Sequence, residues 1–251
     1  MAQLKIKNSI YHIEGVLFDK DGTLIELHQL WTNWFEQVWD EVQQHANVNL
    51  KISTVAASIG LDLKSSIISA RGPLAMGTLQ DIAIILTYQL YHEHIPWNDA
   101  VHIVRKSIDA VHQKINWDEL LQPVKGLKSF LQHAKDSGLK MGVVTSDDTD
   151  IAKKHLKQLE IDHFFHSITG SDQIDFPKPF PDIGEKVCQE MNIDANEVIV
   201  IGDTNGDMIL GKNLKAKASI GIVSNENMEN DHLKDANYII NHYDQLSVTK
   251  T

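Results

Sequence analysis

The second half of the chain alternates short apolar runs with segments of helical spacing, and this order constrains the fold more than any other feature of the sequence. The apolar runs of strand length are residues 141–144, 168–169, 198–201, 219–223 and 238–240. The segments of helical spacing are residues 151–159, 181–191 and 208–214. Parallel neighbouring strands need a crossover connection about as long as a helix. The alternation therefore predicts a Rossmann-like α/β fold, with a parallel sheet covered by helices on both faces.

The first half of the chain has a different pattern of apolar residues. Residues 13–18 form one more apolar run, which leads into the turn-forming pair Asp21-Gly22 and is expected to be a strand of the same sheet. Beyond that pair, large apolar residues recur at helical spacing, no strand is predicted, and breaks at glycine and proline divide the region into about four helices. The predicted domains are an α/β core of residues 1–24 and 124–251 and an inserted all-helical domain of residues 25–123.

The composition is that of an ordinary globular protein with an excess of acidic groups. Apolar residues make up 42% of the chain, which is enough to form a core, and no apolar stretch is long enough to span a membrane. The 23 basic and 34 acidic side chains give a formal net charge of −11, which repels nucleic acid and anionic membrane surfaces. The single cysteine, Cys188, excludes an intrachain disulfide. We therefore expect a cytoplasmic protein that binds neither nucleic acid nor membranes.

Polar residues follow the predicted strands at the points where they end. In an open parallel sheet, ligands bind at the carboxyl ends of the strands, so these residues are expected to gather at one edge. The residues selected in this way are Asp19, Asp21, Gly22, Thr23, Thr145, Ser146, Lys178, Asp203 and Asp207. They combine four carboxylates with hydroxyl groups and one ammonium group.

These residue types suit a metal ion and a phosphate group. Asp19, Asp203 and Asp207 would repel one another unless a cation lay among them, and an all-oxygen ligand set favours Mg²⁺. Hydroxyl, ammonium and main-chain N–H groups are donors suited to phosphate oxygens. The candidates for that role are Thr145, Ser146, Lys178, Gly22 and Thr23. Together the residues predict phosphoryl transfer.

The motifs resemble a known family, the haloacid dehalogenase superfamily of aspartyl-phosphate phosphatases. Residues 19–23, Asp-Lys-Asp-Gly-Thr, match its first motif, and Thr145 after an apolar strand matches the second. Lys178 resembles the third motif, and Asp203 with Asp207 matches the fourth. The insert between the first two motifs resembles the helical cap of the phosphoglycolate phosphatase and β-phosphoglucomutase branch.

Two positions refine this resemblance. Ser146 stands where the family frequently has asparagine after the second-motif threonine. Asp21 is an acid two residues after the expected nucleophile, whereas dehalogenating members lack an acid there and P-type transport ATPases carry threonine. Dehalogenase and ion-pump activities are therefore disfavoured.

The resemblance implies a role for each residue. Asp19 would attack phosphorus to form an aspartyl-phosphate, and Asp21 would protonate the leaving oxygen and then deprotonate the hydrolytic water. Mg²⁺ would be held by the carboxylates of Asp19 and Asp203 and by the backbone carbonyl of Asp21, with support from Asp207. The groups expected to bind phosphate are Lys178, Thr145, Ser146 and the turn at Gly22 and Thr23. The helical cap would close over the site and read the rest of the substrate.

The expected function is that of a Mg²⁺-dependent phosphatase acting on a small phosphorylated metabolite, such as phosphoglycolate or a sugar phosphate. A phosphomutase or a pyrophosphatase would keep every motif, and a protein that binds a phosphorylated ligand without turnover is a third alternative. Arg71, beside a Gly-Pro pair in the insert, is the one candidate for substrate recognition. Neither the substrate nor the oligomeric state follows from the sequence.

Overall fold

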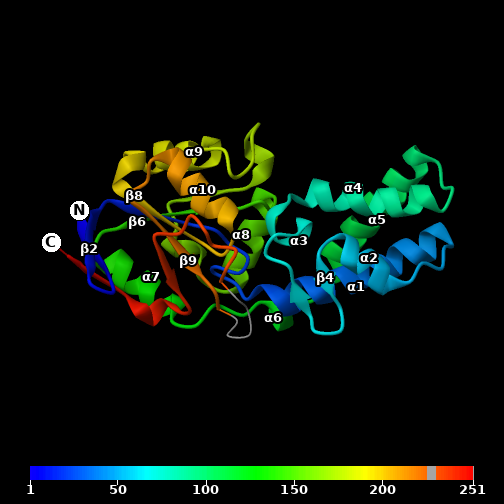
Figure 1. The fold of residues 1–251 in the computed structure, drawn as a ribbon, viewed down its shortest axis with the longest axis horizontal. Coiled ribbons are helices and arrows are strands. Elements are labelled where there is room, and N and C mark those ends of the chain that lie inside the picture. Colours follow the sequence, from blue (N-terminus) through cyan, green and yellow to red (C-terminus); the bar gives the residue numbers. More distant parts are fainter. Residues whose placement is uncertain (225–229, 251) are drawn as a thin grey trace. The chain divides into compact units, whose positions relative to one another are not determined.

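The structure is a computed structural model that describes residues 1–224 and 230–250 (Figure 1). Its internal contacts divide the chain into two units. Residues Met1–Glu26 and Leu121–Thr251 form the first, called the α/β unit below, and residues Leu27–Leu120 form the second, called the helical unit. In the described residues, no helix combines the length and the apolar character that crossing a membrane requires.

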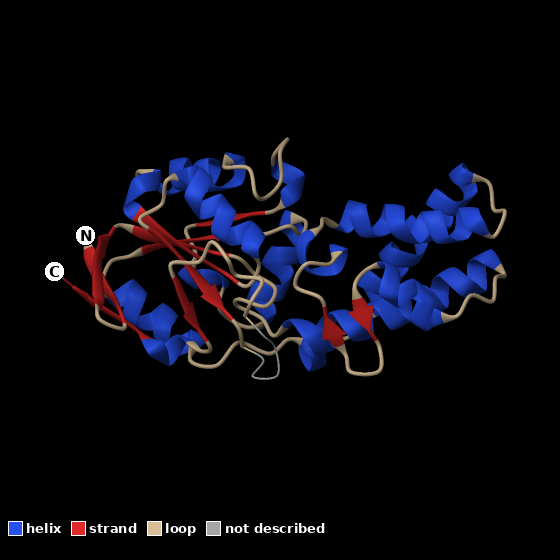
Figure 2. Ribbon diagram, in the orientation of Figure 1, coloured by secondary structure: helices blue, strands red, loops and turns tan. Residues whose placement is uncertain are grey.

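A six-stranded parallel sheet organises the α/β unit and confirms the predicted fold class (Figure 2). Its order is β10-β9-β8-β3-β6-β7, and every neighbouring pair is parallel. The strands are β3 (Gly15–Phe18), β6 (Lys140–Val144), β7 (Ser167–Thr169), β8 (Val198–Gly202), β9 (Ala218–Ile222) and β10 (Tyr238–Ile240). Strand β3 lies between β6 and β8, so the residues that follow it emerge at the middle of the sheet.

Four α-helices connect these strands, and their apolar faces pack on the sheet. They are α7 (Leu127–Asp136), α8 (Thr149–Gln158), α9 (Asp182–Met191) and α10 (Asn205–Leu214). In the view of Figure 1, α9 and α10 lie above the strands and α7 lies below them. One core cluster joins Leu17 of β3 and Val200 of β8 to Val187 of α9 and Leu210 of α10. This packing fixes the strand ends from which the functional loops leave.

A second, antiparallel sheet completes the α/β unit and was not predicted. It has the order β11-β1-β2 and consists of β1 (Ala2–Ile6), β2 (Ser9–Ile13) and β11 (Leu246–Lys250). The single strand expected at residues 13–18 is therefore two strands. Residues up to Ile13 pair with β1, whereas Gly15–Phe18 enter the parallel sheet.

The helical unit contains six α-helices and a short hairpin that the sequence did not predict. The helices are α1 (Leu27–Ala46), α2 (Ile52–Ser58), α3 (Pro73–Met76), α4 (Leu79–His92), α5 (Trp97–Lys114) and α6 (Trp117–Leu120). Trp34 and Trp39 of α1 are fully buried, as expected for an apolar stripe. The unit is not all-helical, because β4 (Leu61–Asp62) and β5 (Ile67–Ile68) form an antiparallel hairpin. Strands of two residues are too short to give a period-two pattern in the sequence.

Candidate active site

The loop that follows β3 carries the first two candidate carboxylates and turns sharply. The Leu24 N–H donates to the Lys20 carbonyl, and Gly22 has φ +81°, in the left-handed region that favours glycine. A Cβ atom on Gly22 would lie only 2.0 Å from Oδ2 of Asp203. Glycine is therefore needed twice, for its backbone conformation and for the close approach of this loop to the loop after β8.

Four of the predicted residues come together at the carboxyl end of the sheet. Lys178 Nζ lies 2.6 Å from Oδ1 of Asp19 and 2.7 Å from Oδ1 of Asp207. Asp19, Asp203 and Asp207 each offer one carboxylate oxygen, and these oxygens all lie within 4.8 Å of one another. The side chains of Asp19 and Lys178 are each 8% exposed, and that of Asp207 is fully buried. The result is a dense, largely desolvated cluster of charge.

Asp207 has a second, structural role at the start of α10. Its Oδ2 accepts hydrogen bonds from the backbone N–H and the hydroxyl of Thr204, at 3.1 and 2.7 Å. This capping box satisfies donors at the helix N-terminus and holds the carboxylate in one orientation. Oδ1 of Asp207 thereby faces Lys178.

Burial and mutual repulsion set the electrostatics of the cluster. Burial raises the pKa of Asp19 to about 7, although the neighbouring Lys178 ammonium lowers it. Burial and the charges of Asp19 and Asp207 raise the pKa of Asp203 well above its usual range. Burial disfavours the charged form of Lys178, but the two carboxylates beside it raise its pKa overall. The lysine therefore stays charged, while burial and repulsion disfavour the ionised forms of Asp19 and Asp203.

The donor set fits a divalent cation. With all groups ionised, the three carboxylates and Lys178 sum to a formal charge of −2. Carboxylate oxygens are the ligands that Mg²⁺ prefers. A cation among them would favour the ionised carboxylates and so oppose the repulsion that raises their pKa values. Asp19, Asp203 and Asp207 are thus the residues that could hold a metal, but the donor set does not identify which metal.

Asp21 belongs to a neighbouring polar group. Its Oδ1 lies 2.7 Å from Nζ of Lys20, which is completely buried. The Lys20 ammonium also lies 3.3 Å from Oδ2 of Asp147 and 3.2 Å from Nδ1 of His155. Burial raises the pKa of Asp147 to about 6, although Lys20 lowers it. Asp21 itself remains partly accessible, with 16% of its side chain exposed.

The groups expected to donate hydrogen bonds to phosphate lie in two places. Thr145 and Ser146 follow β6, the strand beside β3, and the buried Thr145 hydroxyl accepts a hydrogen bond from the Asp147 N–H at 3.2 Å. The N–H of Gly22 donates to the Ile25 carbonyl and that of Thr23 to the Lys20 carbonyl. Both main-chain donors are used by the turn itself. The buried Thr23 hydroxyl has no hydrogen-bond partner among the described residues.

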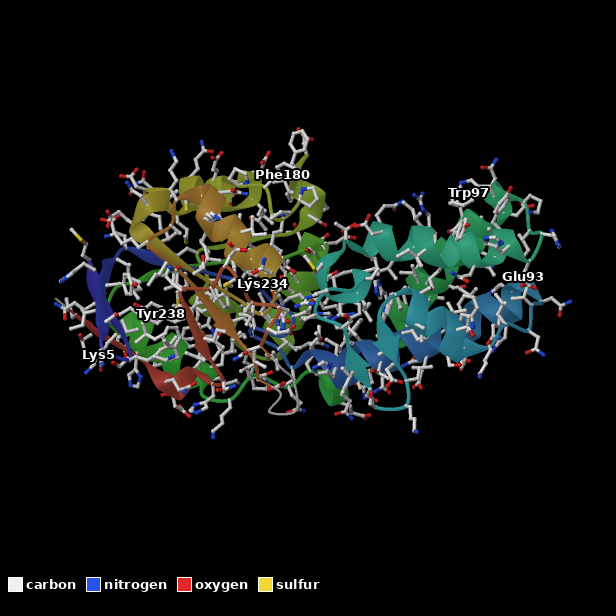
Figure 3. The ribbon with its side chains drawn as sticks, viewed as in Figure 1. Lys5, Glu93, Trp97, Phe180, Lys234 and Tyr238 are labelled. Carbon is white, nitrogen blue, oxygen red and sulfur yellow. The ribbon has the colours of Figure 1, made fainter. Side chains whose placement is uncertain are left out.

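The loop that carries Lys178 presents two aromatic rings to solvent. Phe176 and Phe180 are both about half exposed, and their ring centroids are 5.6 Å apart. Figure 3 shows the Phe180 side chain pointing away from the strands. Lys178, in contrast, is directed inward to the carboxylates, so side chains of this one loop face opposite ways.

Arg71 lies in the helical unit, between β5 and α3, and is exposed. The carboxylate cluster belongs to the α/β unit. The structure thus brings together the predicted residues of the α/β unit, whereas Arg71 belongs to the other unit.

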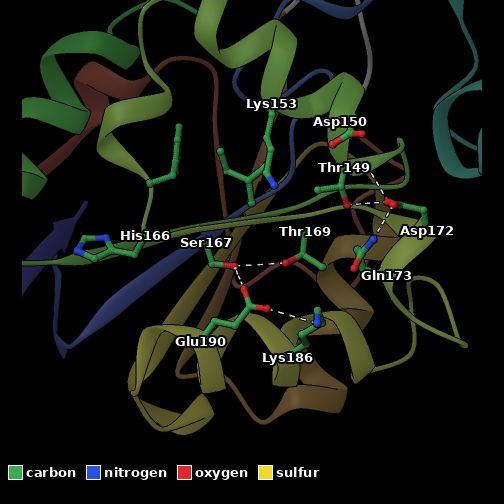
Figure 4. A pocket seen from close by; sticks show the side chains of 12 residues that line it. Thr149, Asp150, Lys153, His166, Ser167, Thr169, Asp172, Gln173, Lys186 and Glu190 are labelled. Atoms are coloured by element: carbon green, nitrogen blue, oxygen red, sulfur yellow. Dashed lines mark hydrogen bonds and ion pairs between the residues drawn. The ribbon is translucent and has the colours of Figure 1, made fainter.

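A separate polar pocket of about 460 Å³ lies beside β7, the outer strand of the sheet (Figure 4). Lys153, Lys186 and Glu190 are among its lining residues, and Glu190 accepts a hydrogen bond from Ser167 at 2.6 Å. None of the residues predicted for the site lines this pocket.

Sequence reasoning missed three buried groups around the site. Lys20 and Asp147 stood next to predicted site residues, but a lysine inside a motif is ordinarily expected to be exposed. The third is His232, whose Nε2 lies 3.0 Å from the backbone carbonyl of Asp203. The available signal for Lys20 was its position two residues after a buried strand, between two carboxylates of the motif.

Comparison with known proteins agrees with this geometry. The family model described as haloacid dehalogenase-like hydrolase matches residues 16–222. A pyrophosphatase PpaX of Halalkalibacterium halodurans is 29% identical over 109 residues, which cover 43% of this chain and 51% of that protein, so the match spans about half of that relative. A pyrophosphatase PpaX of Bacillus mycoides is 24% identical over 82% of this chain and 81% of its own length.

Solved structures show the same fold at low sequence identity. A crystal structure described as a predicted phosphoglycolate phosphatase from Haemophilus somnus superposes with a TM-score of 0.68 at 16% identity, covering 92% of this chain and 95% of that one. A β-phosphoglucomutase from Clostridium difficile superposes with a TM-score of 0.62 at 17% identity, covering 93% and 92%. With the family match extending over most of the sequence, the chain belongs to the haloacid dehalogenase-like hydrolase family.

Proposed function

We propose that this protein is a Mg²⁺-dependent phosphatase that hydrolyses a small phosphorylated metabolite through an aspartyl-phosphate on Asp19. The observation that carries the proposal is the contact of Lys178 Nζ with Asp19 Oδ1, at 2.6 Å, inside a buried cluster of three carboxylates. A carboxylate nucleophile beside a fixed ammonium and a cation site has what in-line phosphoryl transfer needs, because such catalysis depends on positioning and on charge stabilisation.

In the first step, a carboxylate oxygen of Asp19 forms a bond to phosphorus while the bond from phosphorus to the leaving oxygen breaks. Asp21, protonated, donates its proton to that leaving oxygen. In the second step, Asp21 accepts a proton from water as the water oxygen attacks phosphorus, and the Asp19 carboxylate is released with inorganic phosphate. Its 16% exposure leaves Asp21 accessible to both proton partners.

Lys178 stabilises the charge that develops on the transferring phosphoryl group. Its ammonium stays charged because Asp19 and Asp207 raise its pKa, and it already contacts the nucleophile. Thr145 and Ser146, at the end of the neighbouring strand β6, are proposed as further phosphate contacts, as is the Thr23 hydroxyl. The N–H groups of Gly22 and Thr23 are not included, because they donate within the turn. Each donor of this kind is worth about 3 to 4 kcal/mol of transition-state stabilisation in measured enzymes.

Asp19, Asp203 and Asp207, with the backbone carbonyl of Asp21, are the groups proposed to hold Mg²⁺. The ion supplies positive charge that brings the anionic nucleophile and the anionic phosphate together. The formal charge of −2 on the cluster supports a divalent ion. Asp203 is the ligand best placed to test the assignment, because Lys178 forms ion pairs with the other two carboxylates.

Two substrate classes have separate support. The curated relatives are named pyrophosphatases, which favours a diphosphate substrate. The solved structures named as a predicted phosphoglycolate phosphatase and a β-phosphoglucomutase share the fold of this chain. Because the motifs and the helical insert resemble that branch, we propose a phosphomonoester as the first candidate. Pyrophosphate is the second, on the names of the relatives, and Arg71 of the helical unit is proposed as the residue that reads the substrate.

The test is release of inorganic phosphate from three substrates: phosphoglycolate, a hexose phosphate and pyrophosphate. Each is assayed with wild-type protein and Asp19→Asn, with Mg²⁺ and with a chelator. Release that requires both Asp19 and the metal supports the proposal, and the preferred substrate separates the two classes.

Two other results would contradict the phosphatase proposal. Conversion of the hexose phosphate into an isomer without phosphate release would instead support a mutase. Tight binding of a substrate by folded wild-type protein, with no turnover, would support a binding protein.

A further inference from the structure

Lys20, which lies between the proposed nucleophile and the proposed acid, is the most deeply buried charged side chain next to the site. Its side chain has no exposed surface. Most lysines keep the ammonium group in water, and burial of an unpaired charge costs several kcal/mol. A lysine in this place therefore needs strong polar partners.

Those partners come from three different parts of the α/β unit. Nζ of Lys20 lies 2.7 Å from Oδ1 of Asp21 in its own loop. It lies 3.3 Å from Oδ2 of Asp147, in the loop after β6, and 3.2 Å from Nδ1 of His155 on α8. Asp147 and His155 are themselves buried. The ammonium is thus fixed in position by elements that are packed on the sheet.

The consequence falls on Asp21. Its Oδ1 is occupied by Lys20, whereas in residues 1–224 and 230–250 no protein group donates a hydrogen bond to its Oδ2. A carboxyl group held by one oxygen presents the other in a defined direction. A general acid must point its proton at the leaving oxygen, because proton transfer requires hydrogen-bond geometry between the two oxygens.

We propose that Lys20 is the positioning residue for Asp21, and that Asp147 and His155 anchor it. The inference rests on the proposed function, since it assigns to Asp21 the role of proton donor. Lys20 does not touch the substrate in this account. It fixes the carboxyl group that does.

A lysine with only a structural role would behave differently in one measurable respect. Loss of general acid catalysis lowers the rate of hydrolysis most for substrates with a poor leaving group, because a good leaving group departs without a proton. Loss of folded protein lowers the rate with every substrate alike. The parameter to compare is kcat/KM, which reports steps only up to the first irreversible one and so excludes hydrolysis of the aspartyl-phosphate.

The experiment compares Lys20→Met with wild type on 4-nitrophenyl phosphate, which has a good leaving group, and on benzyl phosphate, which has a poor one. We expect kcat/KM to fall about 10-fold to 100-fold for benzyl phosphate, within the range of a lost general acid, and by less than about threefold for 4-nitrophenyl phosphate. Asp21→Asn should show the same selectivity for the leaving group. Lys20→Arg should restore part of the benzyl phosphate activity.

Two further variants keep the test decisive. Lys20→Met leaves the buried Asp147 carboxylate without its partner, so Lys20→Met/Asp147→Asn is measured beside it to remove both charges. Lys217→Met is the matched control, because Lys217 is an ion-paired lysine of the same unit, 2.5 Å from Glu197 and outside the site. It should leave both substrates unaffected.

Equal loss of kcat/KM on the two substrates, in folded Lys20→Met and in the double variant, would overturn the inference while leaving the phosphatase proposal intact. A wild-type protein that releases no phosphate from these two substrates or from phosphoglycolate, a hexose phosphate and pyrophosphate, or that keeps its activity in Asp19→Asn, would overturn the proposed function itself and the role of Lys20 with it.

Discussion

The ammonium of Lys178 bridges Asp19 and Asp207, with Nζ 2.6 Å from one carboxylate and 2.7 Å from the other. The three residues come from the loop after β3, the loop before α9 and the first turn of α10. The contact therefore joins segments that are far apart in the sequence and places a permanent positive charge against the proposed nucleophile.

Replacement of Lys178 by methionine removes that charge. We expect kcat to fall about 100-fold to 1000-fold, the loss seen when one stabilising donor is removed from a transition state. KM should change much less. Steady-state kinetics on the preferred phosphate substrate provide the measurement, and Lys212→Met, at an exposed lysine of α10, is the control. A fall in kcat smaller than tenfold would exclude Lys178 from the chemical step.

Metal binding should depend on pH around neutrality. Burial raises the pKa of Asp19 to about 7 in the metal-free protein, so below that pH a cation must displace a proton from the cluster. The apparent affinity for Mg²⁺ should therefore fall as the pH drops from about 8 to 6. Calorimetric titration with Mg²⁺ at several pH values, in buffers of different ionisation enthalpy, measures both the affinity and the proton release. An affinity independent of pH over this interval would contradict the raised pKa.

The free energy of unfolding of the metal-free protein should depend on pH in the opposite direction to the Mg²⁺ affinity, and should fall as the pH rises. A carboxyl group whose pKa is higher in the folded state than in the unfolded state favours folding while it is protonated. The stabilisation is present below the ordinary pKa of 3.8 and is lost as the pH rises to about 7. Burial also raises the pKa of Asp147, to about 6, and gives the same sign. Denaturation with chelator present should show this loss above pH 4, and Mg²⁺ should restore stability at pH 8.

Gly22 tests the close packing of the two carboxylate loops. Alanine there would take φ +81° and place its Cβ 2.0 Å from Oδ2 of Asp203. We expect Gly22→Ala to abolish metal-dependent activity and to destabilise the fold by more than 1 kcal/mol. Gly138→Ala is a matched control, because Gly138 has φ +78° but nothing within 4 Å of a built Cβ. It should lose about 1 kcal/mol of stability and keep its activity. Equal effects of the two substitutions would mean that backbone strain alone matters at Gly22.

Much of this arrangement follows from the sequence, because the strand ends can be recognised locally. The apolar runs that became β6 and β8 are followed directly by polar residues that close the strand. A parallel sheet then places those strand ends at one edge. This reasoning predicted that Asp19, Lys178, Asp203 and Asp207 would lie together. In the structure Lys178 contacts Asp19 and Asp207, and one oxygen of Asp203 lies within 4.8 Å of those carboxylates.

The remaining features depend on pairings over long sequence distances. Strands β1 and β11 come from opposite ends of the chain. Each alternates apolar and polar residues, but local sequence does not show that the two strands pair with each other. The burial of Lys20 depends on Asp147 and His155, which reach it only through the packing of β6 and α8 against β3. Local sequence cannot distinguish such a lysine from the exposed lysines that are the rule.

Arg71 offers a test of substrate recognition by the helical unit. If Arg71 binds the substrate, Arg71→Ala should raise KM about tenfold or more with little change in kcat, because a binding contact held equally in ground and transition states affects KM alone. The control is Arg105→Ala, the other arginine of this unit, whose guanidinium contacts Gln80 at 3.4 Å. Unchanged KM for every phosphate substrate would remove Arg71 from the site.

If Asp19 is the nucleophile, it becomes phosphorylated during turnover, and this intermediate can be trapped. Wild-type protein and Asp21→Asn are mixed with substrate and Mg²⁺, quenched in acid within one turnover, digested and analysed by mass spectrometry. We expect one added phosphoryl group on the peptide that contains Asp19, with slower decay in Asp21→Asn and no adduct in Asp19→Asn. Turnover with no adduct in either protein, or an adduct on a peptide that lacks Asp19, would rule out Asp19 as the nucleophile.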